Sequence, residues 1–467
     1  MTKEQRERLK QLGRQGFIRE EMLRLGFWPP DPETAKKVES ATVELKGLYS
    51  ELVRLRKELT DIEQEIAGLG DIPKLIAEVR RARIERVRTE RARRKEERQA
   101  QIQAKREADR EWRRKTLPYL GRGVSAGLRY EGGDSDKVAA LGLPALETAS
   151  DIAQAIGITE PELAWLSFHR TAASIDHYNR FTIPKKKGGV RVISSPKRRL
   201  RVAQGWLLTA ILDKLTVHDA AMAFRPGRSV VDNAARHQGK AVIVKVDLKD
   251  FFPSILLKRV KGLFQSFGYN EGVATILALI ATETPRAPVV LDGQKRFVAV
   301  GEQCLPQGAC TSPAITNLLC RKLDSRMTGL AETMGFTYTR YADDLVFSHD
   351  SPDAPVGQVL FLGRQIITGE GYVVNEEKTQ VLRPGQRQNV TGLVVNGAET
   401  GPRVSRRDLR NFRAFLHQCG TKGTATMSEQ IGKDAVSYAR GYLAFVHMSR
   451  PEVAARILSE NPWLGAK

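Results

Sequence analysis

Two runs of strand-forming residues flank a pair of adjacent aspartates in the stretch FTYTRYADDLVFSHD, residues 336–350. Aromatic and β-branched residues favour strands, and two such runs around a short polar pair are typical of a β-hairpin. We therefore expect an antiparallel hairpin with Asp343 and Asp344 at its tip. Acidic residues are common in turns for conformational reasons, so this stretch alone does not predict chemistry.

A further aspartate ends a strand of a different kind. The stretch AVIVKVDLKDFFPSI, residues 241–255, begins as the apolar run of a buried strand and places Asp247 where that run ends. An unpaired carboxylate is costly to bury, so Asp247 predicts a bound cation, a basic partner or an exposed strand end. If Asp247 lies beside the hairpin tip, the three carboxylates could hold two Mg²⁺ ions and support phosphoryl transfer.

The rest of the globular part has an α+β pattern. Helical patterns such as ALETASDIAQAIG and PELAWLS precede strand and hairpin signals such as RFTIPKKKGGVRVISSP, which are interleaved with further helices. This mixture predicts an antiparallel sheet with helices on one side.

Charge and cysteine content limit the partners and the compartment. Lysine and arginine total 75 against 54 acidic residues, a net charge of +21, which predicts nucleic acid or an anionic membrane surface as partner. The four cysteines form no CxxC pair, which disfavours a zinc site and suits a reducing compartment.

The N-terminus lacks the apolar core of a signal peptide, and the longest apolar run, residues 273–281, is too short to span a bilayer. Charge alone does not choose between the two partners, and our prediction is a cytoplasmic protein that binds nucleic acid and no membrane.

The N-terminal region predicts long helices. An apolar stripe with spacings of three and four predicts a coiled coil, formed by self-association or within the chain. Its members are Leu45, Leu48, Leu52, Leu55, Leu59, Ile62, Ile66 and Leu69. Residues 77–115 hold 16 basic and 8 acidic residues without glycine or proline, which predicts a helix that is either solvated or an arm for RNA or a partner. We expect a helical extension over residues 1–120 and a linker over 121–136.

Six segments, taken in chain order, resemble the conserved segments of reverse transcriptases. They are FTIPKKKGGVRVISSP, AFRPGRSVVDNA, VKVDLKDFFPSI, LPQGACTSPAITNLLCRKLD, RYADDLVF and GYVVNEEKTQVL, over residues 181–382. Six matches in family order are far more specific than any one of them. The resemblance implies an RNA-directed DNA polymerase with a right-hand fold: fingers and palm over residues 137–383 and a helical thumb over 384–467.

The resemblance also implies roles for single residues. The metal ligands would be Asp247, Asp343, Asp344 and the backbone carbonyl of Leu248, with Mg²⁺ as the metal and deoxynucleoside triphosphates as substrates. Phe252 would exclude a ribose 2′-hydroxyl, and Lys378 would meet the departing pyrophosphate. The other nucleotide-binding residues would be Lys185, Lys186, Lys187, Arg191, Gln307 and Gly308.

Two short elements are similar to those of bacterial retron reverse transcriptases. One is NAxxH, with Asn233 and His237, and the other is VTG, with Val390, Thr391 and Gly392. The resemblance implies a cognate noncoding RNA as template and 2′-hydroxyl primer, a branched RNA–DNA product (msDNA), and a role in anti-phage defence with an effector protein. The expected RNA-binding residues are those of the two elements together with Arg406, Arg407 and Arg410 in the thumb.

Two alternatives remain open at this stage. A group II intron-like reverse transcriptase would carry DNA-binding and endonuclease regions after a long thumb, for which we expect this chain to be too short. A noncatalytic RNA-binding scaffold would be expected to have lost one of the three aspartates, and all three are present.

Overall fold

The computed structural model describes residues 1–27, 32–68, 72–185, 188–291, 293–397 and 401–465. The chain divides into two units, Met1–Arg106 and Glu107–Lys467. The limits of fingers, palm and thumb at residues 137 and 384, and of the extension at 120, stay predictions.

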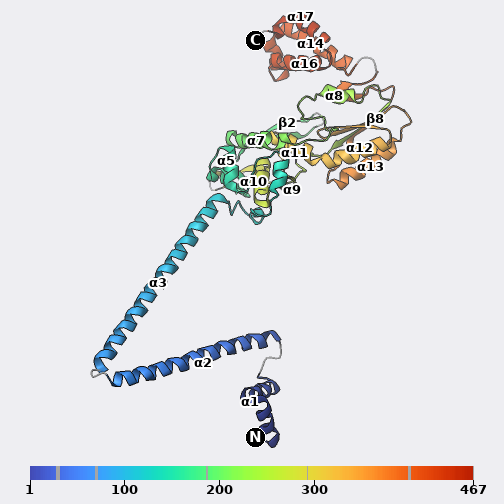
Figure 1. Cartoon of the computed structure of the whole chain (residues 1–467). Helices are drawn as coiled ribbons and strands as arrows, with labels where there is room; N and C mark the ends of the chain where they lie inside the picture. Colours follow the sequence, from blue (N-terminus) through green and yellow to red (C-terminus); the bar gives the residue numbers. More distant parts are fainter. Residues whose placement is uncertain (28–31, 69–71, 186–187, 292, 398–400, 466–467) are drawn as a thin grey trace. The chain divides into compact units, whose positions relative to one another are not determined.

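In the described part of the N-terminal region there are three helices: α1 (Lys3–Arg24), α2 (Pro32–Ala67) and α3 (Ile72–Lys115) (Figure 1). The prediction of long helices is therefore confirmed, and α3 contains the whole basic stretch. The apolar stripe lies on α2, where its members from Leu45 to Ile62 are 47–63% exposed. Leu69 lies outside the described residues. In the single chain, the exposed stripe members are therefore available to a partner rather than part of a core.

A four-stranded antiparallel sheet forms the centre of the second unit, in the order β7–β8–β4–β9. Its strands are β7 (Thr337–Tyr341), β8 (Asp344–His349), β4 (Val242–Leu248) and β9 (Val374–Leu382). The predicted hairpin is β7–β8, but its two turn residues are Ala342 and Asp343, whereas Asp344 is the first residue of β8 and not part of the tip, because it pairs with Tyr341. Almost every residue of β4 is buried, which agrees with its continuous apolar run and with a sheet covered on both faces.

Helices cover both faces of this sheet, not one face as the sequence pattern predicts. Figure 1 shows α12 and α13 on one side of β8 and α8 on the other. Residues of a strand alternate between faces, so Leu345 and Phe347 join the larger core beneath α12 while Val346 joins a second core. The helices nearest the sheet are α8 (Val230–Ala235), α11 (Thr311–Leu319), α12 (Arg321–Thr333) and α13 (Val356–Gly369).

A helical part with two small sheets precedes and interrupts the central sheet in sequence. Its helices are α4 (Ser135–Ala140), α5 (Ala149–Ile156), α6 (Glu160–Ser167), α7 (Arg198–Ala210), η2 (Leu212–Lys214), α9 (Leu257–Ser266) and α10 (Glu271–Ala281). The strands are β1 (Ala172–Ala173), β2 (Tyr178–Pro184), β3 (Val190–Pro196), β5 (Arg286–Leu291) and β6 (Gln294–Ala299), paired as β2–β3 and β1–β6–β5. Every residue of α10 after its first is buried, so this helix is the centre of the part.

The glycine-rich segment 121–136 is packed rather than extended. It contains the short helix η1 (Ser125–Gly127), and Val124 is buried in the larger core. Its first residue, Gly121, has φ 109°, and an added Cβ there would overlap the backbone of His169. The segment therefore lies against the globular part.

Most of the C-terminal helices pack on the second core, and Met427 forms a smaller cluster with Cys419 and Ala435. The C-terminal helices are α14 (Arg406–Lys422), α15 (Thr424–Ile431), α16 (Ala435–Ser449) and α17 (Pro451–Glu460), followed by η3 (Pro462–Leu464) and preceded by β10 (Asn389–Val390) and β11 (Leu393–Val394). Helix α14 is amphipathic, since Phe412 and Leu416 are buried while its arginines are exposed. Among the described residues, no helix combines the length and apolarity needed to cross a bilayer.

Candidate active site

The two aspartates of the hairpin meet Asp247 of the neighbouring strand. Asp344 opens β8 and lies directly opposite Asp247 in the antiparallel register of β4 and β8. The backbone N–H of Leu248 donates to the carbonyl oxygen of Asp343 over 2.9 Å, which ties the turn to the end of β4. The structure thus brings together the carboxylates that lie about a hundred residues apart in the sequence.

The turn itself has an uncommon backbone. Ala342 has φ 58°, a left-handed conformation that costs a non-glycine residue on the order of 1 kcal/mol or more. A positive φ at the first turn residue matches the twist of a two-residue hairpin. The strained residue directly precedes Asp343, so the backbone around it determines where that carboxylate lies.

The carboxylates destabilise one another's charge. Burial, together with the nearby carboxylates of Asp344 and Asp247, raises the pKa of Asp343 to about 6. Burial is also the main reason that the pKa of Asp344 is raised, and Asp247 adds to that effect. Such a group of half-buried and buried acids favours the approach of a cation.

Lys378 of β9 supplies a cation in this structure. Its Nζ lies 2.8 and 3.0 Å from the two carboxylate oxygens of Asp247, and Asn375 Nδ2 donates to the same carboxylate over 3.0 Å. The hydrogen bond between Lys378 and Asp247 raises the pKa of Lys378. The sequence predicted Lys378 near a leaving group and missed Asn375, although Asn375 lies only three residues before it on the same strand.

The donor chemistry fits a divalent metal, although the ligands are not gathered into a ready site. Carboxylate oxygens are the hard ligands that Mg²⁺ prefers, and a cation would relieve the repulsion that raises the pKa of Asp343. Within the described ranges, no three acidic, histidine or cysteine side chains lie close enough to form a metal cluster. Asp247 is instead engaged by Lys378 and Asn375.

The predicted nucleotide-facing residues lie on several elements. Phe251 is buried in the core, whereas Phe252 is only half-buried and lies 6.4 Å, centroid to centroid, from the ring of Phe224. Of the two adjacent aromatics, Phe252 is thus the one that can meet a ligand. Phe224 has φ 59°, so the loop that carries it also has a left-handed residue.

The loop at Gln307 and Gly308 contacts a strand of the β2–β3 hairpin. The carbonyl oxygen of Gln307 accepts from the N–H of Ser194 over 2.7 Å. Gly308 has φ 122°, and an added Cβ would lie 2.9 Å from the carbonyl oxygen of Ser194. Glycine is therefore required here by the approach of β3, whereas the sequence suggested the approach of a nucleotide.

The predicted triphosphate-binding cations lie on the same hairpin. Lys185 and Arg191 are exposed, at the end of β2 and the start of β3. Lys186 and Lys187 lie outside the described residues. The exposed position of the first two leaves them accessible to a polyanionic ligand.

The NAxxH and VTG elements are neighbours in space, but mostly inside the protein. Thr391 donates its hydroxyl to the carbonyl oxygen of Val230 at the start of α8, over 2.9 Å. Asn233, His237 and Val390 have no exposed surface, so direct contact of these three with RNA does not follow from their placement. Gly392 is exposed and has φ 85°. The arginines of α14 that were predicted to bind RNA are also exposed: Arg406, Arg407 and Arg410.

His237 binds both strands of the β7–β8 hairpin, on the same face of the sheet as the side chain of Asp344. Its Nδ1 lies 2.7 Å from Ser348 Oγ of β8, and its Nε2 lies 2.7 Å from Thr339 Oγ1 of β7. Burial lowers the pKa of His237 to about 3, so the imidazole is neutral. The last residue of NAxxH therefore connects α8 to the sheet that carries the aspartates.

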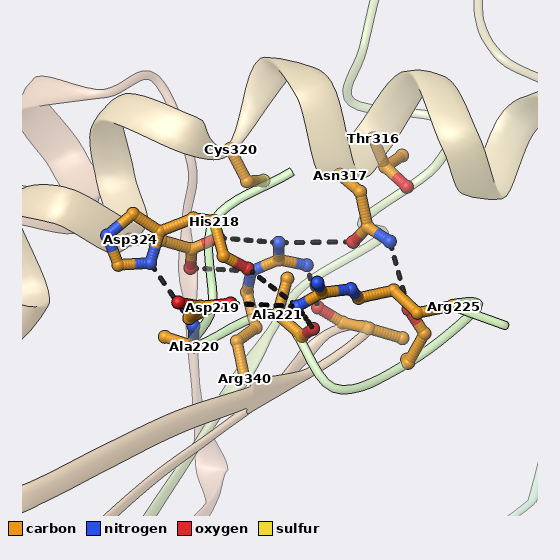
Figure 2. Close-up of polar contacts among 12 residues, drawn as sticks. His218, Asp219, Ala220, Ala221, Arg225, Thr316, Asn317, Cys320, Asp324 and Arg340 are labelled. Atoms are coloured by element: carbon orange, nitrogen blue, oxygen red, sulfur yellow. Dashed lines mark hydrogen bonds and ion pairs between the residues drawn. The ribbon is translucent and has the colours of Figure 1, made fainter. Parts of the chain in front are cut away.

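Sequence reasoning also missed a buried ion pair on the opposite face. Arg340, three residues before Asp343 on β7, forms two hydrogen bonds to Asp324 of α12, and both side chains are fully buried (Figure 2). The only signal in the sequence was a charged residue in the middle of an otherwise apolar and aromatic strand.

Comparison with known proteins agrees with this geometry. The family model described as reverse transcriptase (RNA-dependent DNA polymerase) matches residues 183–403. The retron Mx162 reverse transcriptase of Myxococcus xanthus is 41% identical over 374 residues, covering 76% of each chain. The retron Mx65 enzyme of the same organism is 43% identical over 324 residues, covering 69% of this chain and 73% of the relative.

A more distant relative aligns over most of its own length. The retron Ec86 reverse transcriptase of Escherichia coli is 34% identical over 310 residues, covering 66% of this chain and 86% of the relative. Among solved structures, telomerase from Candida albicans in complex with a fragment of telomeric RNA aligns over 58% of this chain and 56% of that one, at 12% identity. The TM-score of this alignment is 0.38. On the strength of its relatives, the chain belongs to the bacterial retron reverse transcriptases and is an RNA-directed DNA polymerase.

Proposed function

We propose that this enzyme uses a cognate structured noncoding RNA both as template and as the source of the 2′-hydroxyl primer, and makes branched msDNA. Family membership supports the reaction class, because reverse transcriptases use divalent metal ions and deoxynucleoside triphosphates. The observation that carries the proposal is the position of Asp247 opposite Asp344, beside Asp343. The primer hydroxyl would be the nucleophile, and no protein side chain is assigned as its base.

Asp247, Asp343 and Asp344, with the backbone carbonyl of Leu248, would hold two Mg²⁺ ions. When bound, these ions would lower the pKa of the primer hydroxyl and neutralise the departing pyrophosphate. Lys378 would then leave the Asp247 carboxylate and bind an oxygen of the pyrophosphate. Its ammonium lies beside Asp247 and is half-exposed, so it can make either contact. Asn375 would keep the Asp247 carboxylate oriented during that exchange.

The incoming nucleotide would lie between the β2–β3 hairpin and the sheet. Lys185 and Arg191 would bind its triphosphate, as would Lys186 and Lys187 on the basis of the sequence. Gln307 and Gly308 would lie beneath it, on the loop bonded to β3. Phe252 would meet the sugar and exclude ribonucleotides, since it is the half-buried member of its aromatic pair.

The RNA partner would be bound largely through its backbone and shape. Arg406, Arg407 and Arg410 are exposed on one helix and suit phosphate contact, and Gly392 and Thr391 lie at the surface of the neighbouring VTG turn. We propose that the enzyme works in the cytoplasm, in an anti-phage defence system with an effector protein. The exposed stripe of α2 would serve self-association.

The test is to purify the protein from bacteria that express its native locus and to analyse the bound nucleic acid on a denaturing gel. Separate samples are treated with DNase, RNase and a debranching enzyme. The proposal predicts a discrete DNA species whose mobility changes after RNase and after debranching. A DNA product that the debranching enzyme leaves unchanged would favour a group II intron-like enzyme with a separate primer. Bound RNA without any DNA would favour a scaffold.

A further inference from the structure

A buried polar network lies behind the catalytic hairpin, on the α11–α12 side of the sheet (Figure 2). Its centre is the guanidinium of Arg340, which donates from Nε and Nη2 to the two carboxylate oxygens of Asp324 over 2.8 and 2.7 Å. The Tyr338 hydroxyl donates to the same carboxylate over 3.0 Å. A buried ion pair contributes little net stability because both charges lose their hydration. Its value here is that it holds the guanidinium in one orientation.

A further donor of Arg340 reaches the turn that carries Asp343. Nη1 donates to the carbonyl oxygen of Ala342 over 3.2 Å. Ala342 is the left-handed residue of the hairpin, and Asp343 follows it directly. The hydrogen bond therefore stabilises a strained peptide at the point where the catalytic carboxylate leaves the backbone.

A second arm of the network reaches the loop before α8. Arg340 Nη2 also donates to Oδ1 of Asn317 over 3.1 Å, and Asn317 Nδ2 donates to the carbonyl oxygen of Ala223 over 2.9 Å. Asn317 is buried, and its two amide atoms face different partners, a donor and an acceptor. One side chain thus connects the Arg340 guanidinium to the loop backbone.

The loop held in this way carries Phe224, the aromatic residue that lies beside Phe252. Phe224 follows Ala223, has φ 59° and contacts the ring of Phe252. The backbone of Arg340 holds the same loop at its other end, since its N–H donates to Ala220 and its carbonyl accepts from Met222. Figure 2 shows Arg225 closing this loop, with hydrogen bonds of 3.2 Å to the carbonyl oxygens of His218 and Ala221.

We propose that Arg340 and Asn317 are positioning residues that set the catalytic turn and the Phe224 loop together. Through this network, one buried guanidinium places both the turn with Asp343 and the loop with Phe224, which lies beside the sugar-facing Phe252. The inference rests on the proposed roles of Asp343 and Phe252. It adds that deoxynucleotide selectivity depends on Asn317, which touches neither metal nor nucleotide.

Asn317→Asp separates the two arms. The aspartate keeps an acceptor for Arg340 but loses the donor to Ala223. Asn317→Ala removes both contacts, and Arg340→Lys keeps the charge beside Asp324 while losing the fork that reaches Ala342 and Asn317. The matched control is Asn270→Asp, because the buried amide of Asn270 likewise donates to a backbone carbonyl, that of Glu147, at a distance from the site.

Extension is measured on a supplied RNA template annealed to a DNA primer, so the outcome does not depend on self-priming. The readouts are the KM and kcat for a deoxynucleotide, the preference over the matching ribonucleotide, and the Mg²⁺ concentration for half-maximal rate. We expect Asn317→Asp to raise the deoxynucleotide KM and lower the preference by about tenfold, the size of one buried hydrogen bond, with the Mg²⁺ requirement unchanged. Asn317→Ala should lower the preference at least as much.

Arg340→Lys should also raise the Mg²⁺ requirement, because it releases the Ala342 carbonyl. The proposal is overturned if Asn317→Asp and Asn317→Ala keep the wild-type preference, or if Asn270→Asp lowers it equally. If Arg340→Lys does not fold, the two Asn317 variants decide the outcome. Normal supplied-primer extension without msDNA in cells would contradict self-priming and leave this inference intact.

Discussion

Asp247 of β4 lies directly opposite Asp344 of β8 across the antiparallel ladder. This pairing places two carboxylates from distant parts of the chain on the same face of the sheet, next to the turn that carries Asp343. The repulsion among them is met in this structure by the ammonium of Lys378. In the proposed function, a metal ion would take over part of this role from Lys378.

Asp343→Asn should abolish DNA synthesis, by at least about a thousandfold, while RNA binding is largely retained, because the change would remove a proposed metal ligand without altering the exposed arginines. The measurement is primer extension beside a filter-binding assay with the cognate RNA. Asp350→Asn is the control, since Asp350 lies just beyond the other end of β8 and pairs only at the surface with Lys240. Wild-type synthesis by Asp343→Asn would exclude the assigned role.

Lys378→Gln should lower the extension rate by about ten- to a hundredfold and make the protein more dependent on divalent cations for stability. The reason is that Asp247 would lose the cation that now faces it. Thermal unfolding is followed in EDTA and in Mg²⁺, and the Mg²⁺-induced rise in Tm should be larger for the variant than for wild type. Arg364→Gln, which removes an exposed ion pair with Glu376 elsewhere on β9, should show the wild-type response. An equal rise in both variants would contradict the exchange of Lys378 for a metal ion.

Phe252→Ala should raise ribonucleotide incorporation relative to deoxynucleotide by about ten- to a hundredfold, with little change in Tm, because its ring is half-buried. Phe251→Ala should instead leave the nucleotide preference unchanged and lower the unfolding free energy by about 3–5 kcal/mol, since Phe251 is in the core. Single-nucleotide extension and thermal unfolding of both variants make the comparison. Unchanged selectivity in Phe252→Ala would remove Phe252 from the nucleotide pocket.

His237→Gln should lower the unfolding free energy by about 2–4 kcal/mol at neutral pH, because His237 joins β7 and β8 through two buried hydrogen bonds. Burial lowers the pKa of His237 to about 3, below the unfolded value near 6.5. The unfolded chain therefore binds a proton that the folded chain does not, and stability falls as the pH drops below about 6.5.

This contribution to the pH dependence, up to about 1.4 kcal/mol per pH unit, should be missing in His237→Gln. Denaturant unfolding over a pH series measures it. His417→Gln, at an exposed position of α14, should retain the wild-type slope. If the slope were the same in all three proteins, His237 would not be the group that titrates.

Leu52→Glu combined with Leu59→Glu should abolish self-association, because both leucines belong to the exposed stripe of α2. Light scattering after size-exclusion chromatography should give a multimer for wild type and a monomer for the double variant. Val53→Glu is the control, because Val53 is 65% exposed but lies off the stripe. A monomeric wild-type protein would leave the stripe to a different partner.

Local pattern alone determined much of this molecule. Alternating and continuous apolar runs gave the hairpin β7–β8 and the buried strand β4, since the period of a strand is short enough to be read in a few residues. The spacing of leucines and the absence of glycine and proline predicted α2 and α3 in the same way. The candidate metal-binding residues Asp247, Asp343 and Asp344 could be named because they lie at or beside the ends of such runs.

Tertiary structure decided how those elements face one another. The sequence could not show that His237 lies inside against Thr339 and Ser348, or that Lys378 faces Asp247, because each contact joins residues a hundred or more positions apart. Arg340 could be seen as a charge in a strand, but its role depends on α11 and α12 covering that face of the sheet. A shift of one residue in strand register would turn every such side chain to the opposite face, so these assignments exist only in the folded chain.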